Sequence, residues 1–384
     1  MRELRGVDTR DLPGLIAALA ELLEGRGPAL APEGAPAGPA ATVPAGVDLV
    51  VSTSGSTGIP KRIAHSRHAL LASARATEEV LGGPGTWVLA LPAHYIAGLQ
   101  VLIRSHVAGT SPESLPGGIF DPAEFAAATE RAAARSPRLY TSLVPAQVER
   151  LLDENHAASL ARYSAVLVGG QFTPGPLRAR AAAADITLVR TYGSSETGGG
   201  CVYDGHPLPG VIAESVGGEI LLGGPTLARG YLDAAGGWDH AATARALSGT
   251  GDDRRFHTGD AGTVSADAGV SITGRRDNVL ISGGINVSLD RIENLLRGLP
   301  GLSPAVVVAA PDARWGQVPV LVLPAGEDPD AALLALARAE CERVIGVAAR
   351  PARLIRVEKI PLLSSGKPDR RGLTARIAAL PPTP

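Results

Sequence analysis

From residue 47 to residue 191 the chain alternates apolar runs with amphipathic stretches of helical spacing, and this alternation constrains the fold most. The expected strands are residues 47–53, 87–91, 139–143, 165–168 and 187–191. The expected helices are 67–81, 122–134, 145–153 and 174–184, with another after residue 95. Alternation of this kind is typical of a layered α/β domain with a largely parallel sheet. The sequence therefore predicts an α/β fold.

The segments on either side of this region differ from it in composition and in the pattern of apolar residues. Residues 11–24 predict an amphipathic helix, and the Gly-, Ala- and Pro-rich residues 26–46 predict a surface linker. Glycine pairs divide residues 210–231 into short apolar pieces, which predicts a β-rich region. Beyond Asp277 we expect a smaller α+β unit, with helices at 288–296 and 329–344 and strands at 305–309, 318–323 and 353–357. We therefore expect a large domain over 1–276, a small mobile C-terminal domain over 277–384, and a hinge at Asp277.

Composition excludes several classes of function. A net charge of -2 without a long basic run argues against nucleic acid as a partner. The two cysteines lack metal-ligand spacing. Residues 1–25 carry charges of both signs, unlike a signal peptide, and no apolar run approaches the ~18–20 residues that span a bilayer. We expect a cytoplasmic protein without membrane insertion, and the oligomeric state stays open, a homodimer included.

The first expected strand runs directly into a loop rich in hydroxyl groups and glycine that ends in lysine. Its sequence from Ser52 to Lys61 is Ser-Thr-Ser-Gly-Ser-Thr-Gly-Ile-Pro-Lys. Hydroxyls, free backbone N–H groups and a lysine suit a phosphate chain. The loop is not a Walker A motif, because two residues separate Gly58 from Lys61. The predicted nucleotide-phosphate site comprises Thr53, Ser54, Gly55, Ser56, Thr57, Gly58 and Lys61, and a plain surface loop is the alternative.

Six segments in order resemble motifs of the adenylate-forming acyl and aryl ligases, which include acyl-CoA synthetases, peptide-synthetase adenylation domains and luciferases. They are residues 54–61, 168–171, 192–197, 257–260, 274–287 and 363–367, and together they cover about residues 50–370. The chain is identified as a member of this AMP-binding superfamily. The resemblance implies the corresponding fold, with a mobile C-terminal domain.

The same resemblance implies roles for residues in these segments. The nucleotide would lie against Gly169, Gly170, Gln171, Tyr192, Gly193, Asp260 and Arg275, with Tyr192 on adenine and the last two at the ribose. Ser195 would contact phosphate, Glu196 would hold Mg²⁺, and Lys367 would assist adenylation. Gly283 and Gly284 would let the arm of CoA pass, and Asp277 would be the pivot. Taken alone, Glu196 is more typical of a solvated loop carboxylate and Lys367 of a surface lysine, and it is the other motifs that favour the functional roles.

Residues 92–100 and 198–205, together with the short region before the phosphate loop, resemble one branch of the superfamily. That branch is the compact bacterial o-succinylbenzoate–CoA ligases of menaquinone biosynthesis. The resemblance implies an acid pocket lined by His94, Tyr95, Gly98, Gly198, Gly199 and Gly200. Tyr95 stands where the branch usually carries histidine, and tyrosine lacks its titration. Arg104, on the expected helix, is either a solvated residue or a contact for a carboxylate or CoA.

The implied reaction has two steps and uses ATP, Mg²⁺ and CoA. A carboxylate attacks the α-phosphate of ATP to give an acyl-adenylate and pyrophosphate, and the CoA thiol then displaces AMP. The alternatives are a ligase for another aryl or acyl acid, an enzyme that loads a carrier protein, and a nucleotide-binding module without catalysis.

Overall fold

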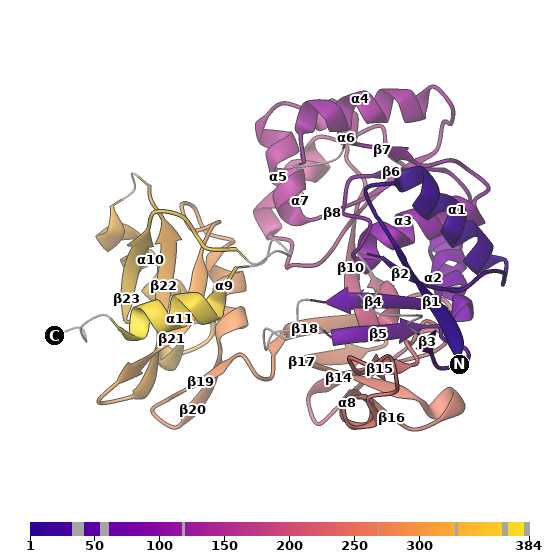
Figure 1. Cartoon of the computed structure of the whole chain (residues 1–384). Coiled ribbons are helices and arrows are strands. Elements are labelled where there is room, and N and C mark those ends of the chain that lie inside the picture. Colours follow the sequence, from indigo (N-terminus) through magenta and orange to yellow (C-terminus); the bar gives the residue numbers. More distant parts are fainter. Residues whose placement is uncertain are drawn as a thin grey trace.

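The computed structural model describes residues 1–32, 42–53, 61–116, 120–267, 269–326, 329–362 and 368–379. Figure 1 shows a larger body that ends with strand β18 and a smaller body that begins with strand β19. Among the described residues, no helix is long and apolar enough to cross a membrane.

One sheet of the larger body carries the start of the predicted phosphate loop. Its strand order is β15 (Gly230–Leu232), β5 (Lys61–His65), β4 (Leu49–Thr53), β2 (Ala29–Pro32), β1 (Arg2–Val7) and β3 (Thr42–Val43). Strands β4 and β5 are antiparallel, and Thr53 lies opposite Lys61 in their ladder. The two ends of the predicted loop are therefore held side by side.

The surface linker expected over residues 26–46 is wrong for residues 29–32. These residues form strand β2, in which all four are buried. The strand pairs in parallel with β1, and its Leu30 also lies beside Leu49 of β4. A short Ala- and Pro-containing segment without periodicity resembles a linker in sequence, but here it is a buried strand between β1 and β4.

The second sheet is the one that the strand–helix alternation predicted. Its order is β12 (His206–Pro207), β11 (Gly199–Tyr203), β10 (Leu188–Ser194), β9 (Ala165–Val168), β8 (Leu139–Leu143), β6 (Thr86–Leu89) and β7 (Glu113–Ser114). Strands β6 to β10 pair in parallel, and β11 and β12 extend the sheet in antiparallel fashion. The predicted α/β fold is confirmed.

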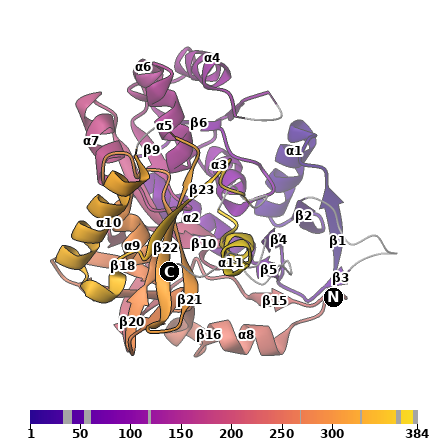
Figure 2. The same ribbon diagram turned by 90° about the vertical axis from the view of Figure 1, so that its left-hand side faces the viewer.

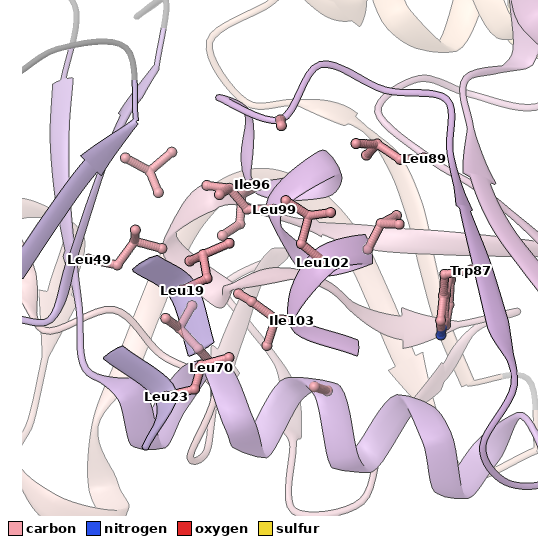
Figure 3. Close-up of a cluster of buried hydrophobic side chains, with 14 of the residues drawn as sticks. Leu19, Leu23, Leu49, Leu70, Trp87, Leu89, Ile96, Leu99, Leu102 and Ile103 are labelled. Atoms are coloured by element: carbon pink, nitrogen blue, oxygen red, sulfur yellow. The ribbon is translucent and has the colours of Figure 1, made fainter. Parts of the chain in front are cut away.

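Helices cover both faces of this sheet. Helices α1 (Leu12–Leu23), α2 (Arg67–Val80) and α3 (Ile96–Val107) pack between the two sheets. Helices α4 (Pro122–Ala133), α5 (Pro145–Asp153), α6 (Ala157–Leu160) and α7 (Gly175–Ala183) cover the opposite face. Figure 3 shows the shared core, with Leu99 and Ile103 of α3 among side chains from α1, α2 and β4. Because α3 is buried between two sheets, its polar side chains are forced into the interior.

The β-rich region predicted after residue 210 is also present. It contains β13 (Ile212–Val216), β14 (Glu219–Gly223), β16 (Leu247–Ser248), β17 (Arg255–Ser265) and β18 (Gly269–Arg275) in one sheet. A short helix, α8 (His240–Ala246), packs beside β15. The sequence did not predict α8, which buries none of its residues.

The smaller body has one mixed sheet with helices on both faces. The sheet contains β19 (Val279–Ser282), β20 (Ile285–Ser288), β21 (Val306–Asp312), β22 (Gly316–Pro324) and β23 (Arg353–Val357). Helices α9 (Leu289–Leu296) and α10 (Asp330–Val344) pack on one face and α11 (Arg370–Ala378) on the other (Figure 2). The hydrophobic clusters that these helices form with the sheet contain no described residue before Leu280. The separate core of the smaller body is consistent with a division into domains 1–276 and 277–384, which stays a prediction.

Candidate active site

Six of the predicted site residues line one cavity of about 400 Å³ in the larger body. They are Lys61, Tyr192, Gly193, Glu196, Asp260 and Arg275. The cavity lies where β5 and β15 of the first sheet meet the end of β10 and the strands β14, β17 and β18. Helix α8 closes one side of it through Ala242, Arg245 and Ala246. Residues distant in sequence thus meet where the parallel strand β10 ends, a common position for ligands in α/β folds.

The turn that follows β10 presents Glu196 to the cavity. Residues Ser195–Thr197 form a single 3₁₀ turn. The Ser194 hydroxyl accepts the N–H of Glu196 at 3.2 Å, and the Thr197 hydroxyl accepts the N–H of Ser194 at 2.9 Å. Gly198 closes the turn at a φ of 69°, in the left-handed region that favours glycine. Reciprocal capping therefore fixes the backbone that carries the predicted metal carboxylate.

Tyr192, Asp260 and Arg275 form one hydrogen-bonded group at the edge of the cavity. The Tyr192 hydroxyl donates to Asp260 Oδ2 at 2.6 Å, and Arg275 Nη1 donates to Asp260 Oδ1 at 3.3 Å. Burial raises the pKa of Asp260, and it also raises the pKa of Tyr192, which the neighbouring carboxylate raises further. The predicted adenine and ribose residues are thus brought together, as a nucleoside site requires.

Arg275 also connects the cavity to the predicted hinge. Its Nε donates to Asp277 Oδ1 at 3.1 Å and its Nη2 to Asp277 Oδ2 at 3.2 Å. These bonds lower the pKa of Asp277. The Arg275 N–H donates at 2.8 Å to Asp290, a residue of α9 in the smaller body. One arginine therefore contacts the predicted ribose aspartate, the predicted pivot and, through its backbone, the smaller body.

Glu196, the predicted magnesium ligand, faces the cavity without an ionic partner among the described residues. Its Oε1 accepts the hydroxyl of Tyr231 at 2.7 Å, and it forms no ion pair with any described residue. Burial raises the pKa of Tyr231, and so does the charge of Glu196. Among the described residues, no group of three or more His, Cys, Asp or Glu could form a metal site on its own. Mg²⁺ commonly binds through one or two carboxylates together with substrate phosphates, and a single unpaired carboxylate in this cavity suits that mode.

The two segments predicted to form the acid pocket lie against each other. The rings of His94 and Tyr95 lie against each other at the start of α3, tilted by 54° with centroids 4.1 Å apart. One turn further along α3, Gln100 Nε2 donates to the carbonyl of Gly198 at 2.8 Å. A Cβ on Gly199 would lie 3.5 Å from Gln100, so the helix and the glycine run are in contact. Gly98 has a separate packing reason to be glycine, because a Cβ there would lie 2.3 Å from the Pro92 carbonyl oxygen.

Arg104 is buried, so its interpretation as a solvated residue is wrong. It is 5% exposed, and its guanidinium lies 5.1 Å from the centroid of the Trp87 ring. Nη2 donates to the Tyr203 hydroxyl at 3.2 Å, and Nε has no hydrogen-bond partner among the described residues. Gln100 Oε1, one turn earlier, also lacks a partner there. A buried cation without a carboxylate partner is costly, and an anionic ligand would offset that cost.

The remaining predicted residues lie elsewhere or outside the described part of the chain. Gly169, Gly170 and Gln171 follow the end of β9, next to β10, and Thr53 ends β4. Ser195 lies in the 3₁₀ turn, Gly200 lies in β11, and Gly283 and Gly284 form the turn between β19 and β20. Ser54, Gly55, Ser56, Thr57, Gly58 and Lys367 lie outside the described residues. The cavity residues that the sequence prediction missed include Tyr231 and Arg245.

Comparison with known proteins identifies the family. Residues 31–232 match the AMP-binding enzyme family, and residues 291–367 match the AMP-binding enzyme C-terminal domain. The chain belongs to the AMP-binding enzymes, which confirms the resemblance inferred from the motifs.

Curated relatives within the family carry more specific names. The chain is 42% identical over 344 residues to a probable 2-succinylbenzoate–CoA ligase of Mycobacterium tuberculosis, a match that covers 86% of this chain and 85% of that protein. It is 30% identical over 295 residues to 2-succinylbenzoate–CoA ligase of Lactococcus lactis, covering 72% of this chain and 60% of that protein.

Solved structures share the fold. The o-succinylbenzoate–CoA synthetase of Bacillus subtilis, in complex with its acyl-adenylate, aligns with a TM-score of 0.73 at 23% identity and covers 85% of this chain and 69% of that chain. An amide bond synthetase of Marinactinospora thermotolerans aligns with a TM-score of 0.76 at 25% identity, covering 97% of this chain and 80% of that chain. The adenylate-forming ligase fold predicted from the sequence is confirmed.

Proposed function

We propose that the chain is an AMP-forming o-succinylbenzoate–CoA ligase. The observation that carries this proposal is the buried guanidinium of Arg104 in the last turn of α3, the helix whose Gln100 contacts Gly198, because this acid has a second carboxylate that needs a cation. The names of the relatives from M. tuberculosis and L. lactis support the same substrate. The cytoplasmic location and the oligomeric state stay predictions.

In the proposed first step the cavity orients the nucleotide. Tyr192 and Gly193 hold the base, and Asp260 with Arg275 holds the ribose hydroxyls. Lys61 binds the phosphates that leave as pyrophosphate, and Glu196 ligates magnesium. When bound, Mg²⁺ would neutralise charge on the phosphates. The acid lies between the start of α3 and the Gly198–Gly200 run, with the reacting carboxylate facing the phosphates.

In the proposed second step the small domain turns about Asp277. Lys367 would then leave the site, and the turn at Gly283 and Gly284 would enter it to guide the CoA thiol. Both glycines have positive φ, 57° and 81°, so this turn favours glycine independently of any ligand. Asp277 is well placed for a pivot because its partner Arg275 ends the last strand of the large domain.

The experiment that tests the substrate is acid-dependent pyrophosphate exchange across a panel. We expect o-succinylbenzoate to give the highest kcat/KM among o-succinylbenzoate, benzoate, salicylate and aliphatic acids. CoA should accept the acyl group in preference to a carrier-protein phosphopantetheine. A higher kcat/KM for benzoate or salicylate would contradict the proposed substrate while leaving the ligase reaction in place.

Replacing Arg104 with glutamine is expected to weaken binding of o-succinylbenzoate. The variant removes the charge that would face the second carboxylate, and a hydrogen bond to a charged group is worth about 1.5–3 kcal/mol. We therefore expect KM for o-succinylbenzoate to rise by about ten- to a hundred-fold, because about 1.4 kcal/mol corresponds to a factor of ten in affinity. The KM for ATP should stay unchanged in pyrophosphate exchange.

A matched control for this variant is Arg75→Gln, which alters an exposed arginine of α2. It should leave both KM values as in the wild type. An equal rise in both KM values of Arg104→Gln would assign Arg104 to the stability of the core instead of to the acid.

A further inference from the structure

The hydroxyl of Tyr231 contacts the carboxylate on which the proposed magnesium site depends. It donates to Glu196 Oε1 at 2.7 Å across 35 positions of sequence. We propose that Tyr231 is a positioning residue that holds the Glu196 carboxylate in the orientation that receives the magnesium ion of the nucleotide. This inference deepens the proposed function and depends on the assignment of Glu196 made there.

Strand pairing and a side-chain bond immobilise Tyr231. It is 4% exposed, and in the ladder between β15 and β5 it lies opposite Ile63. Its N–H donates to the Thr243 hydroxyl of α8 at 3.0 Å, and its carbonyl accepts the N–H of Asp239 at 2.9 Å. The phenol therefore contacts Glu196 from a strand that cannot shift without breaking its pairing with β5 and its bond to α8.

The same segment also holds the backbone of Glu196. The N–H of Ala228 donates to the Glu196 carbonyl at 2.7 Å, and the Ser194 hydroxyl accepts the Glu196 N–H at 3.2 Å. With both backbone groups bonded, the torsions of the side chain remain the main freedom of Glu196. The bond from Tyr231 removes that freedom by engaging one carboxylate oxygen, and the other oxygen stays open to a ligand in the cavity.

A neutral donor suits this position better than a cation would. A phenol orients a carboxylate without neutralising it, so the full negative charge remains for a metal ion. The Lys61 ammonium in the cavity wall lies 5.5 Å from the centroid of the Tyr231 ring and forms no ion pair with Glu196. Hydrogen bonds of this kind to metal ligands are commonly worth about 10- to 100-fold in metal affinity or activity.

The test measures binding of ATP at increasing free Mg²⁺, with no acid or CoA present, for the wild type and Tyr231→Phe. Isothermal titration gives the Mg²⁺ concentration at which ATP affinity is half-maximal. We expect this midpoint to rise about ten-fold in Tyr231→Phe. ATP affinity in excess EDTA should stay unchanged, because the nucleoside contacts remain.

The matched control is Tyr163→Phe. Tyr163 is another buried tyrosine, 3% exposed, with its hydroxyl 2.7 Å from that of Thr129 in the core beneath α4. This variant loses a comparable buried hydrogen bond far from the cavity, and its Mg²⁺ midpoint should match the wild type. Thermal unfolding of both variants shows whether their losses of stability are comparable.

Two results would overturn the inference in different ways. If the wild type binds ATP in a Mg²⁺-dependent manner and Tyr231→Phe leaves the midpoint unmoved, or loses ATP affinity equally with EDTA, Tyr231 has no positioning role. If the wild type itself shows no Mg²⁺ dependence, the assignment of Glu196 fails and the inference fails with it. Neither result depends on which acid the enzyme uses.

Discussion

Lys367→Ala is expected to slow acyl-adenylate formation by about 10²–10³-fold or more, while transfer from preformed adenylate to CoA largely survives. The family assignment places this lysine in the C-terminal domain, at the end of the matched residues 291–367. Its ammonium would stabilise the charge that develops as the carboxylate attacks the α-phosphorus. The thioester-forming step builds up charge at a carbonyl instead, and in the proposed second step the lysine would already have left.

The two half-reactions are measured separately. Pyrophosphate exchange reports on adenylation, and a quenched reaction of synthetic o-succinylbenzoyl-adenylate with CoA reports on transfer. Lys359→Ala is the matched control, because Lys359 is an exposed lysine of the same body. An equal loss in both half-reactions of Lys367→Ala would contradict the proposed division of labour.

The sequence predicts the parts of the fold in which local signals and tertiary packing agree. The helix at 145–153 has the predicted bounds because Pro145 occupies its first position and its apolar face packs against the sheet. Strands β8 and β9 also have their predicted bounds; all residues of both are buried, and β9 is the continuous apolar run that is typical of a buried parallel strand. Strand β2 was missed because its four residues carry no periodicity, and only pairing with β1 and β4 makes them a strand.

The candidate site also has parts that are visible in the sequence and parts that only tertiary packing creates. Motifs that lie within one segment, such as the capped turn at Glu196, are visible in sequence. The bond between Tyr231 and Glu196 is not, because it arises when β15 pairs with β5 and faces the end of β10. For Arg104 a signal was present. Residues 96–103 are apolar except for Gln100, so no face of the helix is polar, and a helix of this kind is expected to be buried together with its arginine.

Glu196→Gln is expected to slow adenylation by about 10²–10³-fold, comparable to the loss of one key charge-stabilising group. Glutamine has the same shape, and its amide oxygen can still accept the Tyr231 hydroxyl, so the turn at residues 195–197 should keep its geometry. What the variant loses is the negative charge that a hard cation requires. Adenylation is measured by pyrophosphate exchange at saturating ATP over a range of Mg²⁺ concentrations.

The control is Glu79→Gln, which alters an exposed glutamate of α2 remote from the cavity. Because the proposed metal acts on the phosphates, transfer from preformed adenylate to CoA should be nearly unaffected in Glu196→Gln. High Mg²⁺ should restore rate in Tyr231→Phe, where the ligand is present but misoriented, and should fail to restore it in Glu196→Gln, where the ligand is gone. If Glu196→Gln retains the Mg²⁺ dependence of the wild type, the metal ligand must be another residue. The proposed role of Tyr231 then loses its basis.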